Sequence, residues 1–289
     1  MIVTDSQVHV WEPHSAARPW PAASLAALPG GFVAAPGARP HRAAPIGADE
    51  MVAMMDAAGV NRAVIVPPSP AGDHNDTALE AAAKYPARFT VMGRFNPSAP
   101  DARERLQGWL AQPGMAGIRM TFHKPQWARW LDDGSIDWFW ADCERIRIPL
   151  MLLIPGRLDA VAAIAQRHPG LALIVDHMGV HSNLRDAQCA PDFEALLRLA
   201  PYANVCVKAS AVPCYTDEAF PYPTMNGFLR RVYEAFGAKR MFWGSDVSRL
   251  PCTYGESVRH FTQGVDFIPA SELRWVMGKG LSEVLGWRG

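Results

Sequence analysis

The feature that most constrains the fold is the regular alternation of short apolar runs with amphipathic helical segments along the whole chain. Some of the runs are almost unbroken, such as Ala63-Val64-Ile65-Val66, and runs of this kind are typical of strands buried on both faces of a parallel sheet. We expect strands at 2–11, 62–67, 89–96, 116–122, 149–154, 171–177, 205–210 and 240–246. We expect helices at 48–58, 75–85, 101–110, 136–147, 158–167, 192–199, 225–236, 256–263 and 272–285.

Strands that alternate with helices predict a parallel sheet built from strand–helix units. The chain has 289 residues, which suits a single α/β barrel of about 250 residues. A doubly wound open sheet is the competing architecture, but no glycine-rich GxGxxG motif follows the first expected strand. We therefore expect an α/β fold, with residues 1–289 forming a single-domain (β/α)8 TIM barrel.

One long segment, 12–47, interrupts this alternation directly after the first strand. It is rich in Pro, Ala and Gly, and it contains Arg18-Pro19-Trp20-Pro21 and His41-Arg42. Structureless loops longer than about 15 residues are uncommon unless they are functional or disordered. We expect loop 12–47 to lie over the carboxyl ends of the strands, as a substrate lid or, alternatively, as a packing or oligomer arm.

Composition narrows the class of protein. Lys+Arg and Asp+Glu both number 28, so no net field favours nucleic acid or an anionic membrane, and no stretch reaches the roughly 18 apolar residues of a membrane span. No signal-like segment opens the chain, and its five cysteines show no CxxC spacing. We expect a cytoplasmic protein with reduced thiols that acts on a small molecule, and homo-oligomerisation stays open.

Three of the expected strands end in residues that can bind a metal or move a proton. Strand side chains alternate, so Asp5, Gln7 and His9 share one face of the first strand. His177 and Asp246 end the sixth and eighth strands, and the carboxyl ends of barrel strands converge on one site. Asp246 could activate water while the two histidines polarise a carbonyl, or these groups with Gln7 could hold one divalent cation, zinc or manganese.

These strand ends resemble the signature strands of the amidohydrolase superfamily. More narrowly they resemble its lactonase branch, which contains 2-pyrone-4,6-dicarboxylate hydrolase and fuconolactonase. The resemblance spans essentially the whole chain and implies a (β/α)8 barrel that hydrolyses a lactone or a related ester-like bond. It also implies that Asp246 is the base and that His9 and His177 are carbonyl or metal partners. The matching pieces are Asp5-Ser6-Gln7-Val8-His9-Val10-Trp11, Asn75-Asp76-Thr77-Ala78-Leu79-Glu80, Ala116-Gly117-Ile118-Arg119, Asp176-His177-Met178-Gly179, Val207-Lys208-Ala209-Ser210, Trp243-Gly244-Ser245-Asp246 and Gly278-Lys279-Gly280-Leu281.

The chain departs from the pattern of this family at one informative position. The family has His-x-His on its first strand, and Gln7 stands in place of the first histidine. An amide oxygen is a poor zinc ligand beside imidazole. The fifth strand also ends without His or Lys, so we expect no two-metal centre. The site either holds one divalent metal or works without metal.

Substrate contacts should come from groups around the mouth of the barrel. Guanidinium forks suit carboxylates, and several basic residues follow the expected strands. We expect an anionic substrate, held by Arg119, Lys208, Arg157 and Arg249, with His123, Tyr215 and His181 as weaker candidates.

The sequence thus favours a hydrolase that opens a small, carboxylated lactone with Asp246-activated water. Two alternatives stay open. One is a metal-dependent non-oxidative decarboxylase of an aromatic or unsaturated carboxylic acid. The other is a barrel that binds an anionic ligand without catalysis.

Overall fold

The computed structural model describes residues 1–22, 37–122 and 125–287. Over these residues the chain forms one eight-stranded parallel sheet in which β1 to β8 follow one another in sequence order. The expected (β/α)8 barrel class is therefore confirmed. The strands are β1 (Thr4–Val8), β2 (Arg62–Ile65), β3 (Phe89–Arg94), β4 (Met115–Thr121), β5 (Leu150–Leu153), β6 (Leu173–Val175), β7 (Val205–Ser210) and β8 (Met241–Gly244).

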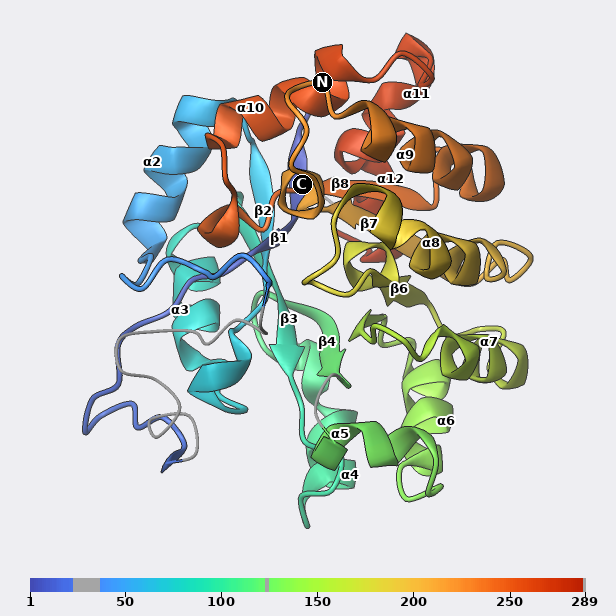
Figure 1. The fold of residues 1–289 in the computed structure, drawn as a ribbon. Coiled ribbons are helices and arrows are strands. Elements are labelled where there is room, and N and C mark those ends of the chain that lie inside the picture. Colours follow the sequence, from blue (N-terminus) through green and yellow to red (C-terminus); the bar gives the residue numbers. More distant parts are fainter. Residues whose placement is uncertain (23–36, 123–124, 288–289) are drawn as a thin grey trace.

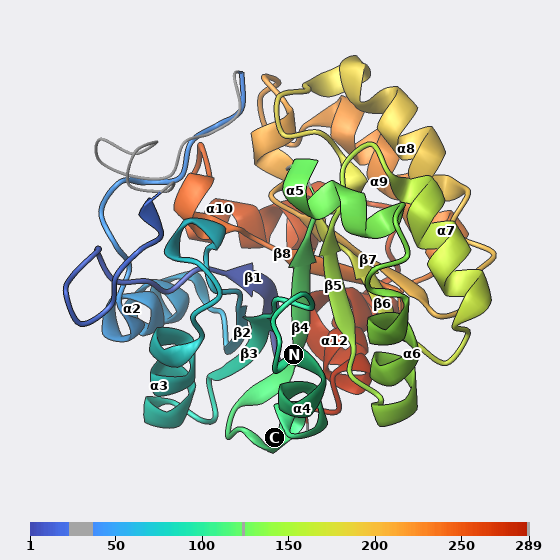
Figure 2. The same cartoon turned by 90° about the horizontal axis from the view of Figure 1, so that it is seen from below.

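The helices surround the strands (Figure 1), and α5 lies beyond the arrowhead of β4 (Figure 2). Most of them match the expected positions, with ends that shift by a few residues. The short α5 was not expected. The helices are α2 (Ala48–Ala58), α3 (Asp76–Lys84), α4 (Ala102–Gln107), α5 (Pro125–Ala128), α6 (Asp137–Ile146), α7 (Leu158–Arg167), α8 (Ala190–Leu197), α9 (Pro223–Phe236), α10 (Tyr254–Arg259), α11 (Ala270–Arg274) and α12 (Gly280–Val284).

The interior of the barrel changes from apolar to polar along the strands. Met92, Ile174 and Cys206 belong to a buried apolar cluster that Leu281 of α12 also joins. Because strand side chains repeat every second residue, Arg94, Asp176 and Lys208 lie on the same inward face, two positions nearer the carboxyl ends. Charged groups are therefore concentrated inside one end of the barrel.

A carboxylate holds β1 and β8 together where the barrel closes. Asp5 accepts hydrogen bonds from the backbone N–H of Ser245 (2.9 Å), from the backbone N–H of Gln7 (2.9 Å) and from the hydroxyl of Tyr254 (2.6 Å). The Ser245 hydroxyl is a further donor. Burial raises the pKa of Asp5 to about 6, against the lowering effect of these hydrogen bonds. The backbone N–H of Asp246 also donates to the Gln7 carbonyl at 3.0 Å.

Two elements differ from the expectation for local reasons. The expected helix 272–285 is broken between α11 and α12, where Gly278 adopts φ 151°. A side chain there would collide with Thr4, because a Cβ atom would lie 2.9 Å from the Thr4 backbone nitrogen. Helix α3 begins at Asp76, one residue later than expected, and the Asn75 side chain bonds both the N–H (2.7 Å) and the carbonyl (2.9 Å) of Arg94.

In the parts of the chain that the structure describes, no helix has both the length and the apolar character needed to cross a membrane. The five cysteines are free thiols, and four of them are buried.

Candidate active site

The structure brings His9, His177 and Asp246 together at the carboxyl ends of β1, β6 and β8. His9 Nε2 lies 3.1 Å from Asp246 Oδ1, and His177 Nε2 lies 3.7 Å from Asp246 Oδ2. The three side chains are almost completely buried. The convergence follows from the parallel barrel, which places the ends of distant strands around one axis.

Asp246 is held as a buried carboxylate. Its Oδ2 accepts a hydrogen bond of 2.6 Å from Arg249 Nε, and Arg249 also donates to the Tyr215 hydroxyl at 2.9 Å. Burial alone would raise the pKa of Asp246, but the Arg249 charge, with His41 and His9, holds that pKa well below its ordinary value. Asp246 therefore stays ionised at neutral pH.

The backbone is strained at these residues. His177 and Asp246 adopt φ 50° and φ 53°, in the left-handed region that non-glycine residues seldom occupy. Such strain persists where the surrounding structure imposes it, and it is concentrated at functional sites. His177 Nδ1 is 2.7 Å from the Ser210 hydroxyl, and burial lowers the pKa of His177 to about 3, so its imidazole is neutral.

His41 is a site residue that the sequence analysis did not single out. Its ring packs edge-on against His9, with centroids 5.2 Å apart, and its Nδ1 lies 2.7 Å from the Ser248 hydroxyl. The backbone N–H of Arg42 donates to the Ser248 carbonyl at 2.7 Å, which ties this part of loop 12–47 to the segment after β8. Burial lowers the pKa of His41 to about 3. A lone histidine in an irregular segment offers no spacing signal.

His9, His41 and Asp246 could hold a metal ion. One ligand atom from each lies within 4.8 Å of the others. His9 Nδ1 is 2.7 Å from the Val66 carbonyl, which can only accept, so Nδ1 carries a proton and Nε2 is the nitrogen that faces Asp246 Oδ1 at 3.1 Å. Two imidazole nitrogens and a carboxylate oxygen are the donor set of catalytic zinc sites with an open fourth position. The donor set therefore fits one divalent cation.

Gln7 presents hydrogen-bond donors to the site. The Lys208 ammonium, which can only donate, contacts Gln7 Oε1. The amide nitrogen then lies 3.5 Å from His9 Nε2 and 3.4 Å from His177 Nε2. In this orientation Gln7 offers N–H groups where the expected metal set has a ligand oxygen. His177 does not belong to the group formed by His9, His41 and Asp246.

Two of the expected substrate contacts are engaged inside the barrel. Lys208 Nζ lies 2.7 Å from Asp176 Oδ1, and Arg119 Nε donates to Asp176 Oδ2 at 3.0 Å. All three side chains are buried. Burial raises the pKa of Asp176, but the charges on Lys208 and Arg119 outweigh this effect and lower it. Both cations have a protein carboxylate as partner, and their contact with substrate stays a prediction.

The other expected contacts are spread over the molecule. Arg249 and Tyr215 are buried beside Asp246, as described above. Arg157 pairs with Asp132 (2.6 Å) near the surface, and His181 Nδ1 lies 2.8 Å from Asp192, so the structure does not bring these two into the cluster. His123 lies outside the described residues.

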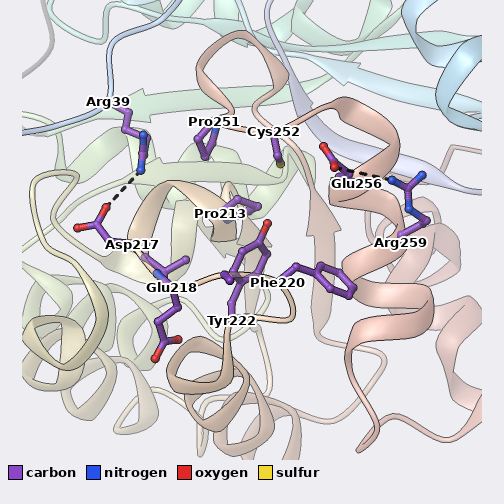
Figure 3. A pocket seen from close by; sticks show the side chains of 12 residues that line it. Arg39, Pro213, Asp217, Glu218, Phe220, Tyr222, Pro251, Cys252, Glu256 and Arg259 are labelled. Carbon is purple, nitrogen blue, oxygen red and sulfur yellow. Dashed lines mark hydrogen bonds and ion pairs between the residues drawn. The ribbon is translucent and has the colours of Figure 1, made fainter.

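A cavity of about 540 Å³ lies beside this cluster, between the segments that follow β7 and β8. Figure 3 shows its wall, where Phe220 and Tyr222 lie opposite Cys252. Arg39, from loop 12–47, lines the same space and pairs with Asp217 at 3.3 Å. The three catalytic candidates do not line this cavity. Loop 12–47 contributes Arg39 to the cavity and His41 to the cluster around Asp246.

Comparisons with known proteins identify the family of this chain. The sequence profile of the amidohydrolase family matches residues 4–279. The chain is 26% identical over 261 residues to the L-fucono-1,5-lactonase of Burkholderia ambifaria, which covers 87% of this chain and 83% of that protein. It is 25% identical over 239 residues to the 4-sulfomuconolactone hydrolase of Hydrogenophaga intermedia, which covers 78% and 74%.

Solved structures share the fold of this chain. An amidohydrolase from Burkholderia multivorans, solved with bound zinc, superposes with a TM-score of 0.76 at 23% identity over 99% of both chains. The family resemblance read from the strand ends is thus confirmed by sequence profile, by curated relatives and by fold. The family profile covers almost the whole chain. The protein belongs to the amidohydrolase family.

Proposed function

We propose that this protein is a hydrolase that opens a small, carboxylated lactone. The observation that carries the proposal is an ionised, buried Asp246 whose Oδ1 faces the His9 imidazole at the mouth of the barrel. The names of the two curated relatives, a fuconolactonase and a sulfomuconolactone hydrolase, support lactone chemistry. The free cysteines fit a reducing compartment such as the cytoplasm.

Asp246 is the general base in this proposal. Because Arg249 occupies Oδ2, the proton of the attacking water goes to Oδ1. The water oxygen bonds to the lactone carbonyl carbon, and the carbonyl oxygen becomes an oxyanion. When the ring C–O bond breaks, the leaving alkoxide takes the proton from Asp246, which restores the carboxylate. The product is an open hydroxy acid.

The oxyanion needs donors that are already in place. The Gln7 amide, fixed by Lys208, and the His177 imidazole line the same space, and we assign the oxyanion to them. A divalent cation held by His9, His41 and Asp246, zinc or manganese by donor type, would polarise the carbonyl or lower the pKa of a bound water.

The test is proton release from a panel of sugar lactones and carboxylated lactones, run with the wild type and with Asp246→Asn. We expect acid production from at least one carboxylated member with the wild type, and its loss in the variant. Carbon dioxide release from an aromatic acid would instead identify a decarboxylase. Tight binding of a lactone without turnover would identify a non-catalytic barrel.

A further inference from the structure

Arg94 is the last residue of β3, and in a parallel barrel it lies at the same rim as the catalytic candidates. It follows Met92 of the interior cluster by two positions, so its side chain enters the barrel. Its Nη1 donates to the Thr121 hydroxyl at 3.3 Å, and the same hydroxyl accepts from Arg119 Nη1 at 2.8 Å. Arg94 is therefore next to the buried Arg119 and Asp176 pair.

The charge of Arg94 is poorly matched by the protein. The residue is only 4% exposed, yet the Thr121 contact is the one side-chain hydrogen bond that its five N–H donors make within the described residues. Nε has no hydrogen-bond partner there. The half-exposed carboxylate of Asp73 forms an ion pair with Arg94 Nε at 3.6 Å, which is longer than a hydrogen bond.

The other two buried guanidinium groups of the site, those of Arg119 and Arg249, each bond a buried carboxylate. Arg119 bonds Asp176 at 3.0 Å, and Arg249 bonds Asp246 at 2.6 Å. Arg119 and Lys208 share the one buried carboxylate of Asp176, and Arg94 is linked to this group only through the Thr121 hydroxyl. A buried charge is costly unless it is paired and hydrogen-bonded, so this side of the barrel lacks a negative charge.

The Arg94 side chain is nevertheless held in place. Asn75 bonds both backbone groups of Arg94, at 2.7 and 2.9 Å, and the guanidinium lies over the Trp127 ring, 5.7 Å from its centroid. Burial, with the neighbouring Arg119 charge, lowers the pKa of Arg94 to about 10 against the raising effect of Asp73, so the guanidinium is still charged at neutral pH. A positioned, charged and undersatisfied fork is suited to bidentate capture of an anion.

We propose that Arg94 binds the anionic substituent, a carboxylate or a sulfonate, of the substrate, and so sets the specificity of the reaction. The inference rests on the proposed lactonase function. It assigns the binding of the substrate anion to Arg94, whose guanidinium has no carboxylate at hydrogen-bond distance among the described residues. It also predicts that Arg94 lowers the stability of the ligand-free protein.

The first experiment compares the wild type with Arg94→Met and Arg94→Lys on muconolactone, which has one carboxylate, and on its carboxamide. We expect Arg94→Met to raise KM for the carboxylate about 50-fold, with a much smaller change for the carboxamide. Arg94→Lys should recover part of the loss, because it restores the charge but not the fork. The matched control is Arg231→Met, whose arginine pairs with Glu194 at the exposed surface and should change neither value.

The second experiment is thermal unfolding of the same variants. Arg94→Met should unfold at a higher temperature than the wild type, because the unmatched charge is gone, and muconolactone should stabilise only the wild type. Equal loss on both lactones, or a lower unfolding temperature in Arg94→Met, would show a structural role and overturn the inference. Turnover restricted to neutral lactones would overturn it while leaving the lactonase proposal intact. Absence of any turnover would refute the lactonase proposal. The rise in unfolding temperature on adding muconolactone, present in the wild type and absent in Arg94→Met, would still test the role of Arg94.

Discussion

At the scale of single residues, the candidate site depends on groups whose charge or orientation is fixed by burial and by neighbouring side chains. Arg249 keeps Asp246 ionised, and burial keeps His177 neutral. Lys208 sets the orientation of the Gln7 amide. Each group therefore enters the reaction in a defined state, which is what preorganised catalysis requires.

Asp246→Asn tests the base directly. The amide cannot take a proton from water, so we expect kcat to fall by about 10³-fold on the best lactone. Circular dichroism and thermal unfolding should still report a folded barrel. The exposed Asp266, paired with Arg230, provides the control Asp266→Asn, which should retain full activity. Wild-type turnover in Asp246→Asn would remove Asp246 from the mechanism.

At the scale of the elements, the closure between β1 and β8 depends on the Asp5 carboxylate. The Asp5 carboxylate only accepts hydrogen bonds, and three of its donor groups belong to the segments that follow β8. Strands far apart in sequence are joined here by a side chain. The same closure positions Gln7 and Asp246, because their backbones bond each other at 3.0 Å.

Asp5→Asn should weaken this closure. The NH₂ group that replaces one carboxylate oxygen is itself a donor and would face a second donor, so a hydrogen bond would be lost. We therefore expect the free energy of unfolding to fall by about 3 kcal/mol. Urea denaturation measures this change. The exposed Asp49, bonded to Lys84, gives the control Asp49→Asn, for which we expect a loss below about 1 kcal/mol. Equal losses in the two variants would contradict the assigned role of Asp5.

At the scale of the whole molecule, loop 12–47 and the segments after β1 and β8 meet at the possible metal ligands. His41, from that loop, is one of the three possible ligands. A cation bound there would therefore join the loop to the barrel, and metal binding would stabilise the folded chain as well as the site.

Metal removal tests this link. Dialysis against a chelator should lower both turnover and the unfolding temperature, and added zinc should restore them. His41→Gln should weaken zinc binding, measured by titration calorimetry, about 10- to 100-fold. Full activity with less than about a tenth of an equivalent of bound metal would place the reaction on Asp246, Gln7 and His177 alone.

The acid stability of the barrel depends on neutral, buried histidines such as His260. Burial lowers its pKa to about 4, and its Nε2 lies 2.7 Å from Asn226 Oδ1. In the unfolded chain His260 binds a proton below about pH 6.5, whereas in the folded chain it binds one only below about pH 4. Stability should therefore fall as the pH drops through this window, by about 3 kcal/mol from this group. Unfolding of wild type and His260→Gln at pH 7 and pH 4 measures the difference, and identical pH dependence in both would contradict it.

The sequence by itself determined the architecture and the position of the site. Continuous apolar runs specify strands buried on both faces, and their alternation with helices specifies a parallel barrel. Since the strand ends of such a barrel converge, the sequence alone predicts that His9, His177 and Asp246 lie close together. These predictions rest on short-range patterns, which is why they could be made from the sequence.

Only the tertiary structure decided which charges are matched. Lys208 meets Gln7 and Asp176 across the barrel, Arg119 meets Asp176, and Arg94 meets no carboxylate at hydrogen-bond distance among the described residues. His41 enters the site through a loop with no periodic pattern. The reason is physical: the partner of a buried side chain is set by the closure and register of the barrel, which join residues as far as 249 positions apart.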